Sequence, residues 1–108
     1  MSHSKPIRYQ IKIESTAFGA AEAGEIGRVI EPLLDTDNAL LVLDLSAVER
    51  IDWHGLQAIA AAAGRVRPKG DVVVCGASHE VAGMIHLVRI DQKLRLFPNL
   101  EAACQALD

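Results

Sequence analysis

Residues 40–56 read LLVLDLSAVERIDWHGL, and the architecture predicted for this chain is built around them. The first six are apolar except for Asp44, which is typical of a strand buried on both faces of a sheet. A short connection then brings Asp52 to the start of a helix, where its carboxylate can accept hydrogen bonds from free amides and its charge suits the helix dipole. Trp53 and His54 follow in the first turn. An indole ring and an imidazole at an exposed helix start indicate a docking surface.

This stretch resembles the signature of the STAS domain, a family named for sulfate transporters and anti-sigma-factor antagonists. The likeness lies in a strand that ends in Asp-Leu-Ser at residues 44–46, a short loop, and Ile-Asp-x-x-Gly-Leu at residues 51–56, which opens a helix rich in small residues. In phosphorylatable members, the second variable position of this motif is the Ser or Thr that a partner kinase modifies. His54 occupies that phospho-acceptor position here, so the usual hydroxyl is missing.

Length and composition predict one domain, spanning residues 1–108, with an aliphatic core, because only one Trp, one Tyr and two Phe are present. The net charge of -3 and the lack of a Lys/Arg cluster argue against nucleic acid as a partner, since phosphate contacts need a basic stripe. No apolar run approaches the roughly 20 residues of a membrane span, and the N-terminus lacks the apolar segment of a signal peptide. We therefore expect a cytoplasmic protein without a transmembrane segment.

Residue patterns that support catalysis or cofactor binding are missing from the sequence. It holds neither a Walker motif nor Gly-x-Gly-x-x-Gly, and no Ser-His-Asp pattern in its expected context. No two of the four histidines have the i, i+4 spacing of metal ligands on a helix. Cys75 and Cys104 lie far apart and outside any Cys-x-x-Cys pair, which predicts buried free thiols. We expect no enzyme activity, no cofactor and no metal.

Apolar periodicity places the remaining elements. Residues 1–6 are predicted to be a loose tail, and the alternation over residues 7–13 predicts an edge strand with one wet face. Residues 26–34 have a helical period that Pro32 should bend or end. One strand is thus predicted before this helix, where STAS domains usually carry two. The other predictions are a helix from about Gly55 to Arg67 stopped at residues 68–70, a buried strand at 72–75, a helix capped by Ser78, a short strand at 94–97 and a final helix capped by Asn99.

Strands that alternate with helices predict an α/β fold. We expect a small, mainly parallel sheet with an antiparallel or edge strand at the N-terminus, packed by about four helices. Loops beyond the carboxyl ends of the strands form the usual binding edge of such a sheet. Residues 52–55 and 76–79 follow two of these strands, so they should form one surface with Trp53 at its centre. The predicted partner-binding residues are Asp52, Trp53, His54, Gly55, Leu56 and Ser78.

Each of these residues also has a purely structural interpretation. Asp52 can be only a helix cap, and Trp53 can fold back over the core as packing. His54 can be an ordinary polar residue at a helix start, a partner contact, or a reactive imidazole. Asp44, at the end of its strand, is expected to accept hydrogen bonds from loop amides. Ser46 and Ser78 lie near the predicted surface.

The resemblance implies a non-enzymatic, protein-binding regulatory module that resembles an anti-sigma-factor antagonist. Its partner would be a bacterial anti-sigma factor of the serine-kinase type or another STAS-containing assembly, bound without the usual serine phosphorylation switch. The alternatives are an accessory subunit of a transporter of anions or lipids, and a sensor of nucleotides or other small ligands. A homodimer could form if the edge strand at residues 7–13 paired with a copy of itself.

Overall fold

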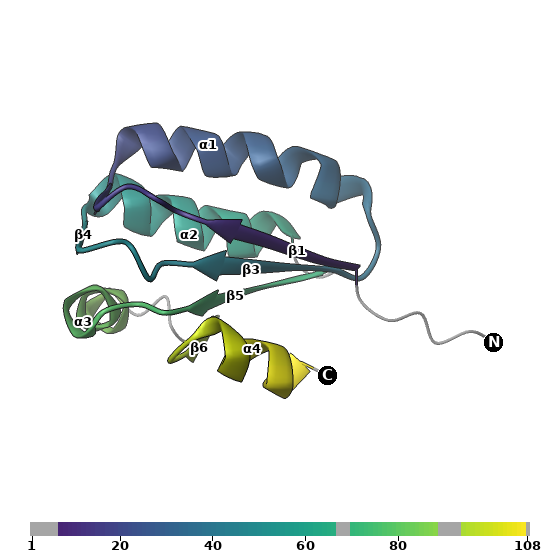
Figure 1. Cartoon of the computed structure of the whole chain (residues 1–108). Helices are drawn as coiled ribbons and strands as arrows, with labels where there is room; N and C mark the ends of the chain where they lie inside the picture. Colours follow the sequence, from purple (N-terminus) through teal and green to yellow (C-terminus); the bar gives the residue numbers. More distant parts are fainter. Residues whose placement is uncertain (1–6, 67–69, 89–93, 108) are drawn as a thin grey trace.

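The computed structural model describes residues 7–66, 70–88 and 94–107, and its centre is a four-stranded sheet (Figure 1). The strand order is β1-β3-β5-β6, and all three pairings are parallel. This confirms the predicted α/β class with a mainly parallel sheet. The strands are β1 (Ile7–Lys12), β3 (Ala39–Asp44), β5 (Asp71–Cys75) and β6 (Arg95–Phe97).

Helices cover both faces of the sheet. Helices α1 (Ala20–Ile30) and α2 (Trp53–Val66) lie together on one face, and α4 (Leu100–Leu107) lies on the other (Figure 1). Helix α3 (His79–Leu87) lies at the end where the strand arrows point (Figure 1). The carboxyl ends of the strands, the start of α2 and α3 therefore share one end of the molecule, as the sequence predicts.

The core is divided by the sheet into a large and a small cluster. Leu41, Leu43 and Val74 point into the large cluster with the apolar sides of α1, α2 and α3. Val42 and Val73, on the opposite face, belong to the small cluster under α4. Because β3 and β5 are buried on both faces, their sequences are continuous apolar runs rather than alternating ones.

The N-terminal third adds one short strand to the prediction, and its partner strand near the middle of the chain is a second addition. Strand β1 is an edge strand, as expected, but it pairs with β3 in parallel rather than antiparallel orientation. Strand β2 (Ala17–Phe18), which sequence patterns did not reveal, pairs in parallel with β4 (Arg50–Ile51) in a separate two-stranded sheet. Helix α1 ends at Ile30, and Pro32 opens the 3₁₀ helix η1 (Glu31–Asp35), so the predicted break is confirmed.

Most other boundaries agree with the sequence to within a few residues. Helix α2 starts at Trp53, two residues before the predicted Gly55. The caps of α3 and α4 are confirmed, since Ser78 Oγ accepts a hydrogen bond from the Val81 amide and Asn99 Oδ1 accepts one from the Ala102 amide. The predicted tail at residues 1–6 and the residues 67–69 at the end of α2 lie outside the described residues.

The two cysteines occupy different environments. Cys75 is buried in β5, as predicted, and Cys104 on α4 is only half-buried; both thiols are free. Burial, assisted by the nearby charge of Asp44, raises the pKa of the Cys75 thiol to about 11. A protonated thiol inside the sheet is a poor nucleophile, so Cys75 serves as a small core residue.

Candidate functional site

The carboxyl edge of the sheet is built by tight turns that follow β3 and β5. Asp44 Oδ1 accepts a hydrogen bond of 3.0 Å from the Ser46 amide, which confirms the predicted role of this carboxylate. The Leu45 amide donates to the Cys75 carbonyl oxygen at 2.9 Å and ties the two turns together. Gly76 has a φ of +73°, a conformation that glycine adopts without strain, and the chain turns there toward α3.

Asp52 fixes the start of α2. Its Oδ1 accepts a hydrogen bond of 3.1 Å from the Gly55 amide, so the predicted N-cap is confirmed. Its own amide donates to the Phe18 carbonyl oxygen at 3.2 Å, which joins the helix start to β2. A β-carbon on Gly55 would lie 2.6 Å from that same carbonyl oxygen. Only glycine therefore allows α2 to approach β2 this closely.

Trp53 and His54 project from this helix start into solvent. Trp53 is 59% exposed, which supports the docking interpretation of the indole over the packing one. The His54 side chain is also exposed, and its Nδ1 lies 3.7 Å from Asp52 Oδ1. At this distance the two groups interact by charge when the imidazole is protonated, but they do not form a hydrogen bond. Gly55 and Leu56, by contrast, are buried and hold the exposed pair in place.

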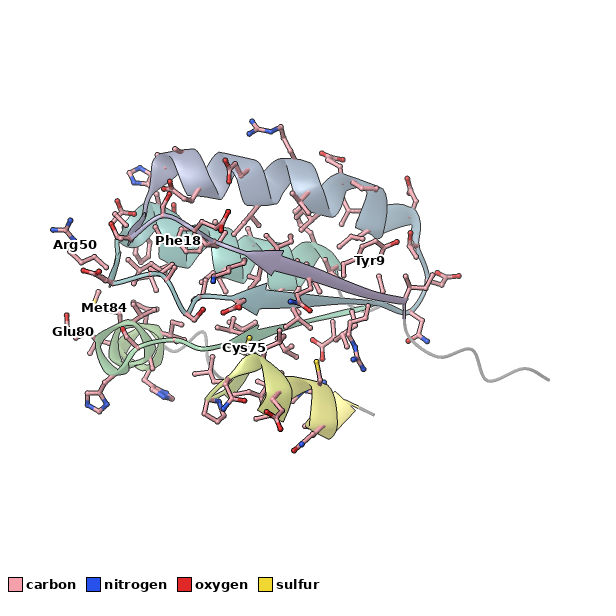
Figure 2. All side chains as sticks on the ribbon, in the orientation of Figure 1. Tyr9, Phe18, Arg50, Cys75, Glu80 and Met84 are labelled. Carbon is pink, nitrogen blue, oxygen red and sulfur yellow. The ribbon has the colours of Figure 1, made fainter. Side chains whose placement is uncertain are left out.

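An open groove runs from the loop after β3 to the start of α3. Its lining residues are Ser46, Val48, Glu49, Arg50, Ser78, His79 and Glu80. Two smaller hollows adjoin it: one reaches Met84 on α3, and the other reaches Asp52 and Gly19. Arg50 lines all three, and Figure 2 shows Arg50, Glu80 and Met84 gathered at this end of the molecule. Ser78 thus shares a groove with Arg50, while Trp53 lies outside the lining of these hollows.

Arg50, Glu49 and Glu80 cannot be recognised as site residues from the sequence. Charged residues in a loop, in a two-residue strand and in the first turn of a helix have no distinguishing pattern of their own. The groove exists because two loops that are far apart in sequence meet at one edge of the sheet. The one available signal was the position of these residues next to the predicted carboxyl-end loops.

Glu22 on α1 stabilises the segment around β2, at the carboxyl edge of the sheet, through two hydrogen bonds. Its Oε1 accepts a hydrogen bond from the Gly19 amide at 2.9 Å, and its Oε2 accepts one from Ser15 Oγ at 2.9 Å. These hydrogen bonds, that of Gly19 above all, lower the pKa of the Glu22 carboxyl below its ordinary value. Burial and the like charge of Asp52 act in the opposite direction but do not outweigh them. The ionised carboxylate therefore caps the start of α1 and orders residues 15–19.

We expect the stability contributed by Glu22 to depend on pH. Because the pKa is lowered on folding, this contribution is complete above the ordinary carboxyl pKa and is lost as the pH falls through the folded-state pKa. Glu22→Gln should therefore destabilise the protein at neutral pH, and the difference from wild type should shrink in acid. Urea unfolding at both pH values measures this. Glu25→Gln on the same helix removes an equal charge without these hydrogen bonds, and an equal pH-dependent effect there would contradict the assignment.

Three further features of the described residues bear on chemistry. They contain no group of three or more His, Cys, Asp or Glu side chains placed to hold a metal ion. Side-chain nitrogen and oxygen atoms that are buried in this part of the chain all have hydrogen-bond partners. No helix in the same residues is long and apolar enough to cross a membrane.

Comparison with solved structures gives the same fold at low sequence identity. A protein assigned as an anti-sigma factor antagonist from Thermotoga maritima matches with a TM-score of 0.76 and 17% identity, over 91% of this chain and 86% of its own. An anti-sigma-factor antagonist (STAS) domain protein from Planctomyces limnophilus matches with a TM-score of 0.65 and 16% identity, over 84% of this chain and 86% of its own.

A transporter has the same fold in one part of its chain. The murine anion transporter solute carrier 26 family member A9 matches with a TM-score of 0.78 and 17% identity, over 98% of this chain but only 18% of the transporter. A search of curated protein sequences found no significant match. The family model of the STAS domain matches residues 13–103, which is most of the chain. The chain therefore belongs to the STAS domain family.

Proposed function

We propose that this chain is a non-enzymatic, cytoplasmic regulatory module that acts as an anti-sigma-factor antagonist. Its partner is an anti-sigma factor of the serine-kinase type, and the contact is made by the start of α2 and the adjoining start of α3. Binding sequesters the anti-sigma factor and frees a sigma factor for transcription. The proposal rests on membership of the STAS family and on the site at the carboxyl edge.

The exposed Trp53 is the observation that carries the proposal. A large indole that is 59% exposed contributes little to the core, and it lies directly after the Asp52 cap on a rigid helix start. Aromatic anchors of this kind dominate the binding energy of many protein interfaces. Asp52 and His54 are its neighbours in the sequence and offer polar contacts, Ser78 offers another from the start of α3, and the buried Gly55 and Leu56 position the helix. This division of roles suits a preformed surface that binds a protein.

His54 gives the proposed module its distinctive property. By resemblance it stands where phosphorylatable relatives carry Ser or Thr, and imidazole cannot become a phosphoserine. The surface therefore stays in the state that corresponds to the unmodified antagonist. A serine kinase that binds the module finds no hydroxyl at residue 54. It therefore cannot end the complex by phosphorylating that residue.

The direct test measures association between the purified chain and each serine-kinase-type anti-sigma factor of the organism that encodes it, by isothermal titration calorimetry. Saturable binding to at least one of them is expected. If none binds, the antagonist function is refuted. Saturable nucleotide binding in the same assay would instead favour a sensor, and co-purification with a membrane transporter would favour the accessory-subunit alternative.

We expect His54→Ser to recreate a phospho-acceptor. The new hydroxyl would lie at an exposed position in the first turn of α2, where the helix dipole stabilises a phosphate. The cognate kinase should then incorporate one phosphate at residue 54, detected by mass spectrometry, and binding should weaken. His54→Ala is the matched control without an acceptor. Normal kinase binding without modification of the serine variant would show that the loop is not presented to the kinase active site.

A further inference from the structure

The hollow between β4 and α3 combines apolar and acidic side chains. Its volume is about 220 Å³, and its lining residues are Glu49, Arg50, Ile51, Glu80, Val81 and Met84. Met84 is 38% exposed, and Figure 2 shows it beside Glu80 and Arg50 at this end of the molecule. Sites for drug-sized molecules have volumes of about 300–1,000 Å³, so this hollow is sized for a single long side chain.

The charged side chains of the hollow have no partners of their own. Glu49, Arg50 and Glu80 form no ion pair and no side-chain hydrogen bond within residues 7–66, 70–88 and 94–107. Two carboxylates beside one guanidinium give the lining a net negative charge, and Asp52 adds another carboxylate in the adjoining hollow. An incoming cation would therefore meet a complementary charge, whereas an incoming carboxylate would meet two like charges.

Hydrogen bonds of the backbone hold both sides of the hollow. The Arg50 amide donates to the Thr16 carbonyl oxygen at 3.0 Å, and β4 pairs with β2. On the other side, the Ser78 cap fixes the first turn of α3, from which Glu80 projects. A surface that is already ordered loses less conformational entropy on binding. The hollow is therefore preformed for an occupant.

We propose that this hollow receives a lysine or arginine side chain of the protein partner. The aliphatic stem packs on Met84, and the cationic head binds the carboxylates of Glu49 and Glu80. Nucleic acid and anionic membrane surfaces carry the same sign of charge as the lining, so neither suits the hollow. The inference rests on the proposed function for the identity of the partner, but the chemistry of the hollow belongs to this chain alone.

Two small probes of opposite charge test the hollow without the partner. n-Pentylammonium and hexanoate carry the same pentyl chain, and NMR of the wild-type chain with ¹³C-labelled Met and Val methyl groups reports where they bind. The ammonium probe should shift the Met84 methyl signal saturably, with a Kd on the order of 10 mM. Hexanoate should not shift it, and Glu80→Gln should weaken the ammonium effect.

Val29 is the internal control for these titrations, because it is 39% exposed on α1 and lies outside the lining of the hollow. Its methyl signals should stay unchanged with both probes. Equal shifts of Met84 by the two probes, equal shifts at Val29, or no saturable shift of Met84 by n-pentylammonium would each overturn the proposal.

Charge variants then test the hollow against the anti-sigma factor itself. In calorimetric titrations, Glu80→Gln should weaken binding about threefold, and Arg50→Gln should strengthen it by a similar factor because it removes a like charge. Glu25→Gln on α1 removes the same charge as Glu80→Gln but outside the hollow, so its Kd should equal that of wild type. The opposite signs for Glu80 and Arg50 would show that the partner inserts a carboxylate and would overturn the proposal. If wild type binds no anti-sigma factor, the proposed function fails, and the probe titrations still decide the chemistry of the hollow.

Discussion

Gly55→Ala is expected to destabilise the protein by about 3 kcal/mol or to prevent folding. A β-carbon at this position would lie 2.6 Å from the Phe18 carbonyl oxygen, 2.7 Å from Ile51 Cγ1 and 2.8 Å from Phe18 Cδ1. Favourable contacts between carbon atoms begin near 3.5 Å, so α2 or β2 would have to move. Such a movement would also stretch the hydrogen bond between the Asp52 amide and Phe18. Backbone, rather than a flexible side-chain end, forms the closest contact.

Gly64→Ala is the matched control for this prediction. Gly64 lies in the same helix, is exposed, and has no atom within 4 Å of the position of an added β-carbon. Alanine has the higher helix propensity, so this variant should gain up to about 1 kcal/mol. Urea unfolding followed by circular dichroism measures both variants. Equal stability of the two alanine variants would contradict the close approach of α2 to β2.

The buried centre of the fold could be predicted because its signals are local. Strands β3 and β5 are buried on both faces, and continuous apolar runs such as Leu40 to Leu43 follow directly from that burial. The caps at Asp52 and Ser78 were equally predictable, because the cap residue and the amide it accepts from lie three residues apart.

The short strands at the carboxyl edge could not be predicted, because their stability comes from tertiary contacts. Strands β2 and β4 have two residues each, too few to show a period. They are held by hydrogen bonds between segments distant in sequence, including those from the Glu49 and Arg50 amides to the Thr16 carbonyl oxygen. Helix α2 shows the same limit on a smaller scale. By helical spacing Ala60 falls on the apolar stripe with Leu56 and Ala63, yet it is only half-buried, while Ala62 is fully buried.

The candidate site, too, could be predicted only where its signal is local in the sequence. The motif at residues 51–56 identified the helix start, but its pattern left the orientation of Trp53 open between packing and exposure. The groove between Arg50 and Glu80 joins residues thirty positions apart, and only the folded sheet brings them together. The carboxyl edge was therefore predictable from the sequence, but its shape was not.

Trp53→Ala is expected to weaken binding of the anti-sigma factor by about 2 kcal/mol, or roughly 30-fold in Kd. The indole would lose its exposed surface to the partner on binding, and truncation removes that apolar contact together with the packing around it. Because the side chain is 59% exposed in the free protein, the free energy of unfolding should change by less than about 1 kcal/mol. Calorimetric titration gives the first quantity and urea unfolding gives the second.

Val29→Ala is the control for Trp53→Ala. It distinguishes the loss of a specific binding anchor from the loss of exposed apolar surface in general. Val29 is 39% exposed on α1, ten residues along the chain from the Gly19 that begins this helix at the carboxyl edge. Its truncation removes exposed apolar area away from the site, so Kd should stay within about twofold of wild type. A stable Trp53→Ala variant that binds as tightly as wild type would move the contact away from the start of α2. Glu80→Lys would then be the next variant, because Glu80 lines the groove at the start of α3, the other half of the proposed surface.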